Sequence, residues 1–154
     1  MVNPAFDGLV LQLPALLEKL RTCPPMKGKP PKDTPLPLRA VYLFSRSDHE
    51  YLYVGRTNRL RQRIREHICG RHNDAPFAFK MARHATGMVK AKGGPTRKML
   101  EADETFLAAF SQAKDDVGRL DWRWVEIEDP NLHCLFEIYA TLALGAQFND
   151  FENH

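Results

Sequence analysis

Two β-type runs and one helical run follow one another between residues 39 and 68, which read RAVYLFSRSDHEYLYVGRTNRLRQRIREHI. The runs 40–45 and 51–55 are rich in β-branched and aromatic residues, and the polar residues 46–49 separate them. This pattern predicts a β-hairpin. The apolar spacing after the second run predicts a helix that reaches about Ile68.

Two tyrosines face each other in the expected hairpin. Symmetric closure of the loop pairs Ser45 with Glu50 and puts Tyr42 directly opposite Tyr53 on one face. Both hydroxyl groups can donate, accept or relay a proton. Because tyrosine also favours strands, the same pair fits simple cross-strand packing. Gly55 closes the second strand, where its missing side chain lets backbone or ligand approach closely.

The helix after the hairpin, which Asn58 can cap, carries three basic residues at four-residue steps. Arg59, Arg63 and His67 therefore share one face, beside an apolar stripe. We expect Arg63 and His67 at the edge of the core next to the hairpin, where an arginine fork fits phosphate oxygens and stabilises charge on them. Taken singly, either residue also fits an ordinary surface position.

The N-terminal part differs in character from the rest of the chain. Leucines at helical spacing predict an amphipathic helix over residues 4–21, which Pro14 kinks or shortens. Residues 23–38 contain six prolines and predict an extended linker rather than packed structure. We therefore assign residues 1–38 to a helix and linker and 39–154 to the main domain, and leave open self-association through the helix.

The remaining elements complete an α+β fold. Helices are expected at 77–86, at 102–113 and from Pro130 to Gly145, and a third strand at 122–128. Asp129 as cap and the proline after it begin the last of these helices. The order predicts a small central antiparallel three-stranded sheet flanked by helices.

The composition of the 154 residues, with 44% hydrophobic and 27% charged, is that of one globular domain. There is no apolar run of the roughly 20 residues that a membrane span needs, and the first twenty residues do not read as a secretory signal. The three cysteines are widely spaced and form no disulfide framework. We therefore expect a cytoplasmic protein with no membrane partner.

Charge is distributed unevenly along the chain. Between Arg56 and Lys98 there are 12 Lys and Arg against 2 Asp and Glu, whereas residues 99–154 hold 12 acidic and 3 basic side chains. Clustered basic residues bind nucleic acid backbones through counterion release. The same distribution also fits a solvated surface that the acidic part neutralises.

Glu137 is the only formally charged side chain between Pro130 and Asn149, and it stands among leucines, alanines and aromatic residues. A carboxylate in such an apolar helix must be paired, hydrogen-bonded or bound to a metal. Glu137 is therefore either the partner of an arginine or a ligand. One carboxylate completed by phosphate oxygens and waters suits Mg²⁺.

The arrangement resembles the GIY-YIG nuclease superfamily. Ala40-Val41-Tyr42 and Tyr53-Val54-Gly55 stand where its two tripeptides stand, and the helix that follows has the family's arginine and histidine at the expected distances. Over roughly residue 39 to the C-terminus, six positions match in order: Tyr42, Tyr53, Arg63, His67, Glu137 and Asn149. Ala40 departs from the first glycine, and about 70–116 form a long insert within the ββαβα core.

The resemblance implies a role for each matched residue. Glu137 binds one divalent cation, Mg²⁺ or Mn²⁺, and Tyr42 is the preferred base toward the attacking water. Tyr53 orients water or phosphate, and Arg63 stabilises the pentacoordinate phosphorus. His67 assists proton transfer or positions a phosphate, and Asn149 holds the local structure by hydrogen bonds.

The expected activity is metal-dependent hydrolysis of DNA phosphodiesters. Arg56 stands where some relatives have a lysine near the active site, and the other basic residues are expected to hold the DNA: Arg59, Lys80, Arg83, Lys90, Lys92, Arg97 and Lys98. The alternative is a catalytically weak nucleic-acid-binding module on the same fold.

Overall fold

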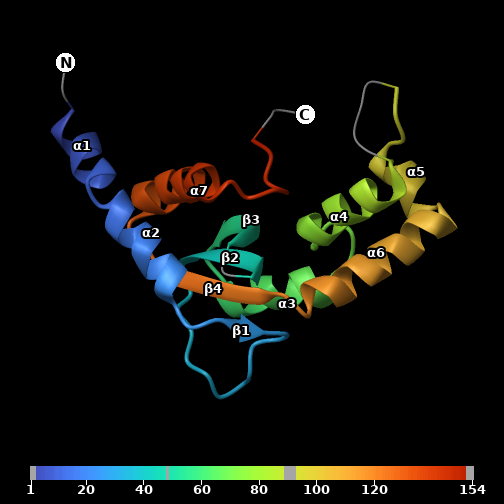
Figure 1. Ribbon diagram of the computed structural model, residues 1–154, viewed down its shortest axis with the longest axis horizontal. Coiled ribbons are helices and arrows are strands. Elements are labelled where there is room, and N and C mark those ends of the chain that lie inside the picture. The colour runs from blue at the N-terminus through green and yellow to red at the C-terminus, as the bar shows by residue number, and fades with distance from the viewer. Residues whose placement is uncertain (1–2, 48, 89–92, 152–154) are drawn as a thin grey trace.

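The computed structural model describes residues 3–47, 49–88 and 93–151 and has a four-stranded antiparallel sheet at its centre (Figure 1). The strand order is β1-β4-β2-β3. The strands are β1 (Met26–Lys27), β2 (Ala40–Ser47), β3 (Glu50–Thr57) and β4 (Asp121–Glu126). The expected α+β class with an antiparallel sheet between helices is confirmed. The predicted strand count of three is wrong, because β1 adds a fourth strand.

Helices cover both faces of the sheet (Figure 1). One face packs against α2 (Leu13–Thr22) and α7 (Pro130–Leu144). On the other face lie α3 (Leu60–Cys69), α4 (Pro76–Thr86) and α6 (Glu104–Val117). Two short helices, α1 (Pro4–Val10) and α5 (Arg97–Glu101), complete the order along the chain. No helix in the described part of the chain has the length and apolar character needed to cross a membrane.

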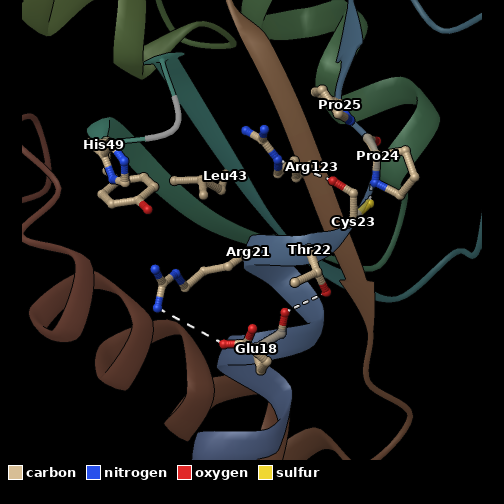
Figure 2. A pocket seen from close by; sticks show the side chains of 10 residues that line it. Glu18, Arg21, Thr22, Cys23, Pro24, Pro25, Leu43, His49 and Arg123 are labelled. Atoms are coloured by element: carbon tan, nitrogen blue, oxygen red, sulfur yellow. Dashed lines mark hydrogen bonds and ion pairs between the residues drawn. The ribbon is translucent and has the colours of Figure 1, made fainter.

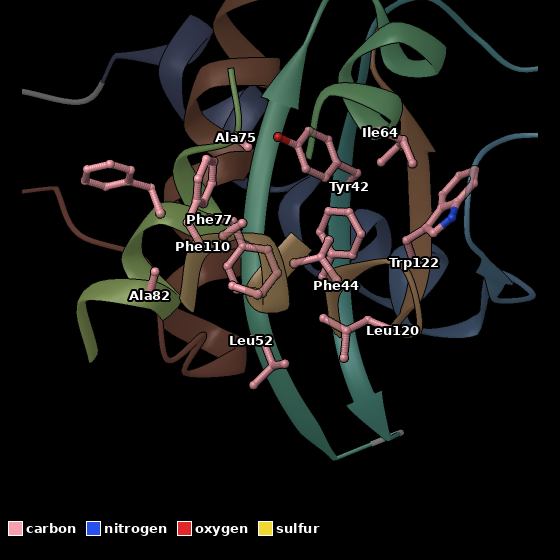
Figure 3. Packing of buried hydrophobic residues seen from close by; sticks show 14 of the residues in the cluster. Tyr42, Phe44, Leu52, Ile64, Ala75, Phe77, Ala82, Phe110, Leu120 and Trp122 are labelled. Atoms are coloured by element: carbon pink, nitrogen blue, oxygen red, sulfur yellow. The ribbon is translucent and has the colours of Figure 1, made fainter. Parts of the chain in front are cut away.

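The central strand β2 is buried on both faces because helices cover both. Val41 and Leu43 point into the cluster formed with α2 and α7. Tyr42 and Phe44 point into the opposite cluster, where Phe77 of α4 and Trp122 of β4 also lie (Figure 3). The alternation of side chains along β2 therefore sends its tyrosine to the same face as α3.

The predicted register of the hairpin is wrong. Tyr42 pairs with Gly55, and Tyr53 lies opposite Phe44. The cause is that β2 continues to Ser47 and the ladder shifts register twice between Phe44 and Ser47, so the loop does not close symmetrically. The two tyrosines still share a face, and their ring centroids are 6.4 Å apart.

The proline-rich stretch 23–38 is attached to the domain, which corrects the prediction of an unpacked linker. Met26 pairs with Trp122 in the sheet, and the Trp122 indole N–H donates to the Gly28 carbonyl at 2.9 Å. At the end of α2 a cavity of about 350 Å³ contains the buried Arg123, whose guanidinium donates to the Cys23 carbonyl at 3.1 Å (Figure 2). This arginine thus fastens the start of the stretch to β4.

Both ends of α7 follow the prediction. The Asp129 carboxylate accepts from the backbone N–H groups of Asn131 and Leu132, and Gly145 ends the helix in the left-handed conformation, with φ at 62°. The predicted N-terminal helix is instead two helices, and Pro14 lies in the first turn of the second. A proline is tolerated there because that N–H needs no helical partner.

Candidate active site

Tyr42 lies across Gly55 in the interior of the domain. The site of a Cβ on Gly55 falls well inside contact distance of the Tyr42 hydroxyl oxygen and Cζ, so only glycine leaves room for this ring. The hydroxyl shares a hydrogen bond of 2.7 Å with His67 Nε2. The close approach predicted at Gly55 is therefore present, and what approaches is the phenol of the neighbouring strand.

His67 is fully buried at the centre of an aromatic cluster. Its ring lies 5.4 Å from the rings of Tyr42, Phe44 and Tyr53. Burial lowers the pKa of the imidazole well below its ordinary value, and the nearby Arg63 guanidinium lowers it further. The ring is therefore neutral near pH 7, and one of its two nitrogens can accept a proton.

Arg63 reaches the same group from the adjoining position of α3. Its Nε donates to the Tyr42 hydroxyl at 3.4 Å, and its Nη1 contacts the Glu66 carboxylate and the Asp74 carbonyl, each at 3.1 Å. These contacts fix the guanidinium while leaving the side chain 22% exposed. Arg63 and His67 lie beside the hairpin as predicted, but only Arg63 is at the edge of the core, whereas His67 is inside it.

Burial holds both phenols in the neutral form. Burial raises the pKa of Tyr42 far above its ordinary value and also raises the pKa of Tyr53. The Arg63 guanidinium lowers both, and the Glu137 carboxylate raises both. Tyr53 also stacks on Phe77 of α4, with 4.8 Å between ring centroids and 9° between planes. Phe77 could not be singled out from the sequence, because an aromatic residue at helical spacing looks the same in an ordinary core and beside an active site.

Glu137 of α7 stands close enough to act electrostatically on both phenols. Its carboxylate accepts from Arg56 Nε at 2.9 Å, and the two side chains are 21% and 45% exposed. Burial raises the pKa of Glu137 above its ordinary value, and the Arg56 guanidinium opposes this. The sequence left Glu137 as either the partner of an arginine or a metal ligand, and the structure shows the arginine partner. Both side chains of the pair are still partly exposed to solvent.

Asn149 binds the backbone of β3 one residue after Tyr53. Its Oδ1 accepts from the Val54 N–H at 2.8 Å, and its Nδ2 donates to the Val54 carbonyl at 2.7 Å. The backbone N–H groups of the preceding residues Gln147 and Phe148 donate to the backbone carbonyls of Tyr51 and Leu52, respectively. The segment after α7 therefore covers part of the free edge of β3.

The basic residues fall into distinct places. Helix α3 begins one residue later than predicted, so Arg59 precedes it and does not share the helical face of Arg63. The Arg59 side chain is 58% exposed. The Asn58 side chain accepts a hydrogen bond from Arg39 Nε and does not cap the helix. Lys98 is exposed on α5. The remaining residues divide in two: Lys80, Arg83 and Arg97 line one cavity with Asn149, whereas Lys90 and Lys92 lie outside the described residues.

The residues present fit a single-carboxylate cation site. Within residues 3–47, 49–88 and 93–151, no group of three or more His, Cys, Asp and Glu is placed to bind a metal. Glu137 is a partly exposed carboxylate whose counter-charge is a half-exposed arginine. One carboxylate with water and phosphate oxygens is the donor set that Mg²⁺ accepts.

Comparison with known families identifies the domain that carries the hairpin and α3. Residues 39–113 match the family described as the GIY-YIG catalytic domain, which spans the hairpin, α3, α4, α5 and most of α6. Searches of curated proteins and of solved structures found no match. The matched region contains Tyr42, Tyr53, Arg63 and His67, which meet in one side-chain cluster. The chain belongs to the GIY-YIG nuclease superfamily.

Proposed function

We propose that the protein is a metal-dependent DNA endonuclease that hydrolyses phosphodiester bonds at this cluster of side chains. The observation that carries the proposal is the Tyr42 hydroxyl in hydrogen-bond contact with both Arg63 and His67. The Glu137 carboxylate also raises the pKa of this phenol. Acid–base and charge-stabilising groups for phosphodiester hydrolysis are thereby gathered around one hydroxyl oxygen.

Tyr42 and His67 form the proton path of the proposed reaction. Tyr42 takes the proton of the attacking water while its own proton passes to His67 Nε2, 2.7 Å away. Burial and Arg63 keep the imidazole neutral, so a ring nitrogen is available to accept this proton, and the same two effects make it a weak base. Two linked transfers avoid a free phenolate at Tyr42, where burial disfavours that ion.

Arg63 and Glu137 supply the charges. The guanidinium of Arg63, held by Glu66 and the Asp74 carbonyl, stabilises negative charge on the pentacoordinate phosphorus. Glu137 would hold one Mg²⁺ or Mn²⁺, which supplies Lewis-acid stabilisation of the phosphate when bound. Tyr53 orients water or phosphate, and Asn149 fixes the strand that carries Tyr53 through its two bonds to Val54.

The proposal is tested by incubating the protein with supercoiled plasmid in Mg²⁺, in Mn²⁺ and in EDTA. We expect nicking that requires the cation, that Glu137→Gln abolishes, and that the exposed control Glu104→Gln retains. Cleavage that persists in Glu137→Gln argues against the assigned cation site. Salt-sensitive DNA binding without turnover under any cation favours the alternative, a nucleic-acid-binding module on the nuclease fold.

A further inference from the structure

A second cavity, of about 620 Å³, adjoins the candidate active site. It lies between α4, the turn before α5 and the segment that follows α7, and Asn149 and Phe148 form part of its wall. Phe148 packs against Phe77 at 5.6 Å between ring centroids, and Phe77 stacks on Tyr53. One layer of aromatic side chains therefore connects this cavity to the two phenols.

Three basic side chains from two helices meet in the cavity. Arg83 of α4 and Arg97 of α5 both lie over the Phe79 ring, 5.2 and 4.0 Å from its centroid. Lys80 donates to the Phe148 carbonyl at 3.1 Å and so joins α4 to the opposite wall. Burial lowers the pKa of Arg83, and the Arg97 guanidinium lowers it further, because the two positive charges repel each other.

An anion between these guanidinium groups removes that repulsion. Asp150 is the acidic residue in the lining, so the formally charged side chains there leave an excess of two positive charges. Arginine is the residue best suited to grip phosphate oxygens with paired N–H groups. The electrostatics of the cavity thus favour a phosphate.

The size of the cavity and its aromatic wall restrict which phosphate-bearing ligand can bind there. The volume falls in the range of sites that enclose one small ligand, roughly 300–1,000 Å³. A base that stays paired and stacked in a duplex does not enter such a site, whereas an unstacked nucleotide does. The exposed His84 ring meets Phe148 edge-on, 5.3 Å away at 90°, and offers a face for a base.

We propose that this cavity binds one unpaired nucleotide of the substrate strand, with its phosphate on Arg83 and Arg97 and its base against His84. The proposal rests on the proposed nuclease function and deepens it. The preferred substrate is then DNA with a single-stranded segment beside the cleaved bond, rather than a continuous duplex.

The test measures DNA binding in EDTA, where no cleavage is required. A fluorescein-labelled single strand of about 12 nucleotides and the duplex of the same length are titrated by fluorescence anisotropy. Arg83→Gln/Arg97→Gln removes two charges from the cavity. Arg65→Gln/Lys98→Gln is the matched control, because it removes two exposed charges outside the lining.

We expect the cavity pair to lose at least tenfold more affinity for the single strand than the control pair, and both pairs to lose duplex affinity to a similar extent. Equal losses for the single strand would overturn the proposal, since the charges then act only as a diffuse basic surface. Urea unfolding of each variant shows whether its fold is retained.

His84→Ala provides a second, independent measurement that leaves every charged residue in place. We expect it to weaken binding of the single strand roughly tenfold, as the loss of one stacked base does. An abasic oligonucleotide keeps the phosphates and should be insensitive to this change. If His84→Ala has no effect on either probe, the base is not held there. If the protein cleaves plasmid but the cavity variants lose no more single-strand affinity than the controls, only the cavity proposal is refuted. If the cavity variants lose that affinity but the protein cleaves no plasmid, only the nuclease proposal is refuted.

Discussion

Gly55→Ala should displace the phenol at the centre of the candidate active site. A Cβ at this position would lie 3.0 Å from Tyr42 Cε1 and closer still to Cζ and the hydroxyl oxygen. Ordinary contact begins at 3.4 Å, so the ring has to shift by about 1 Å. Tyr42 is buried on all sides, and this shift also breaks the 2.7 Å hydrogen bond to His67.

Two terms set the size of the effect. Overpacking a buried site costs roughly 1–3 kcal/mol, and a buried hydrogen bond that is left unmade costs roughly another 1–3 kcal/mol. We therefore expect Gly55→Ala to lower the free energy of unfolding by about 2–6 kcal/mol, against the ~5–15 kcal/mol of an ordinary domain. A shift of ~1 Å at a reacting group also predicts a loss of about a hundredfold in cleavage rate.

Urea unfolding and plasmid cleavage measure the two effects, and a double-mutant cycle assigns their cause. In a Tyr42→Leu background the ring is absent, so Gly55→Ala should cost less than about 1 kcal/mol. Gly8→Ala on α1 is the control, because no atom other than its chain neighbours and the backbone of its own helix lies within 4 Å of the added Cβ. There alanine should be neutral or stabilise the helix by roughly 0.5–1 kcal/mol. A Gly55→Ala protein as stable as wild type, or an equal cost in both backgrounds, would refute the contact.

Three further predictions concern the same site. Asn149→Ala removes both hydrogen bonds to β3 and should lower the free energy of unfolding by about 1–3 kcal/mol in urea titrations; an unchanged midpoint would contradict those bonds. Because the folded-state pKa of His67 is lowered, the unfolded chain binds a proton that the folded chain excludes, and stability is lost as pH falls below about 6.5, by up to ~1.4 kcal/mol per pH unit. In urea titrations, His67→Phe should make the free energy of unfolding less dependent on pH between about pH 7 and 5. A pH dependence parallel to that of wild type would mean that His67 binds its proton in the folded protein as readily as in the unfolded chain. Arg56→Gln frees the Glu137 carboxylate and should strengthen Mn²⁺ binding, followed by paramagnetic resonance of the free ion, by up to about fivefold, whereas Arg59→Gln should not; weaker binding would mean that the arginine orients the ligand.

Features that depend on neighbours in sequence could be predicted in advance. The β-branched runs around Tyr42 and Tyr53, the helical spacing of Arg63 and His67, and the cap at Asp129 all lie within a few residues of the feature they define. Such periodicity and cap chemistry are local, so the α+β class and most elements were correctly placed. The short helix α5 and strand β1 were not, because neither has a repeating pattern long enough to detect.

What the tertiary structure alone decided are the contacts between distant segments. The register that puts Tyr42 on Gly55 depends on two shifts in the β2–β3 ladder. The pairing of Glu137 with Arg56 depends on the packing of α7 beside β3. The cavity that gathers Lys80, Arg83, Arg97 and Asn149 brings together elements far apart in the chain. By itself the sequence determined which residues are chemically competent and, for those inside a strand or helix, which face each occupies. Their partners and burial were decided only in three dimensions, because the energies of packing and charge pairing depend on what the fold brings within a few ångströms.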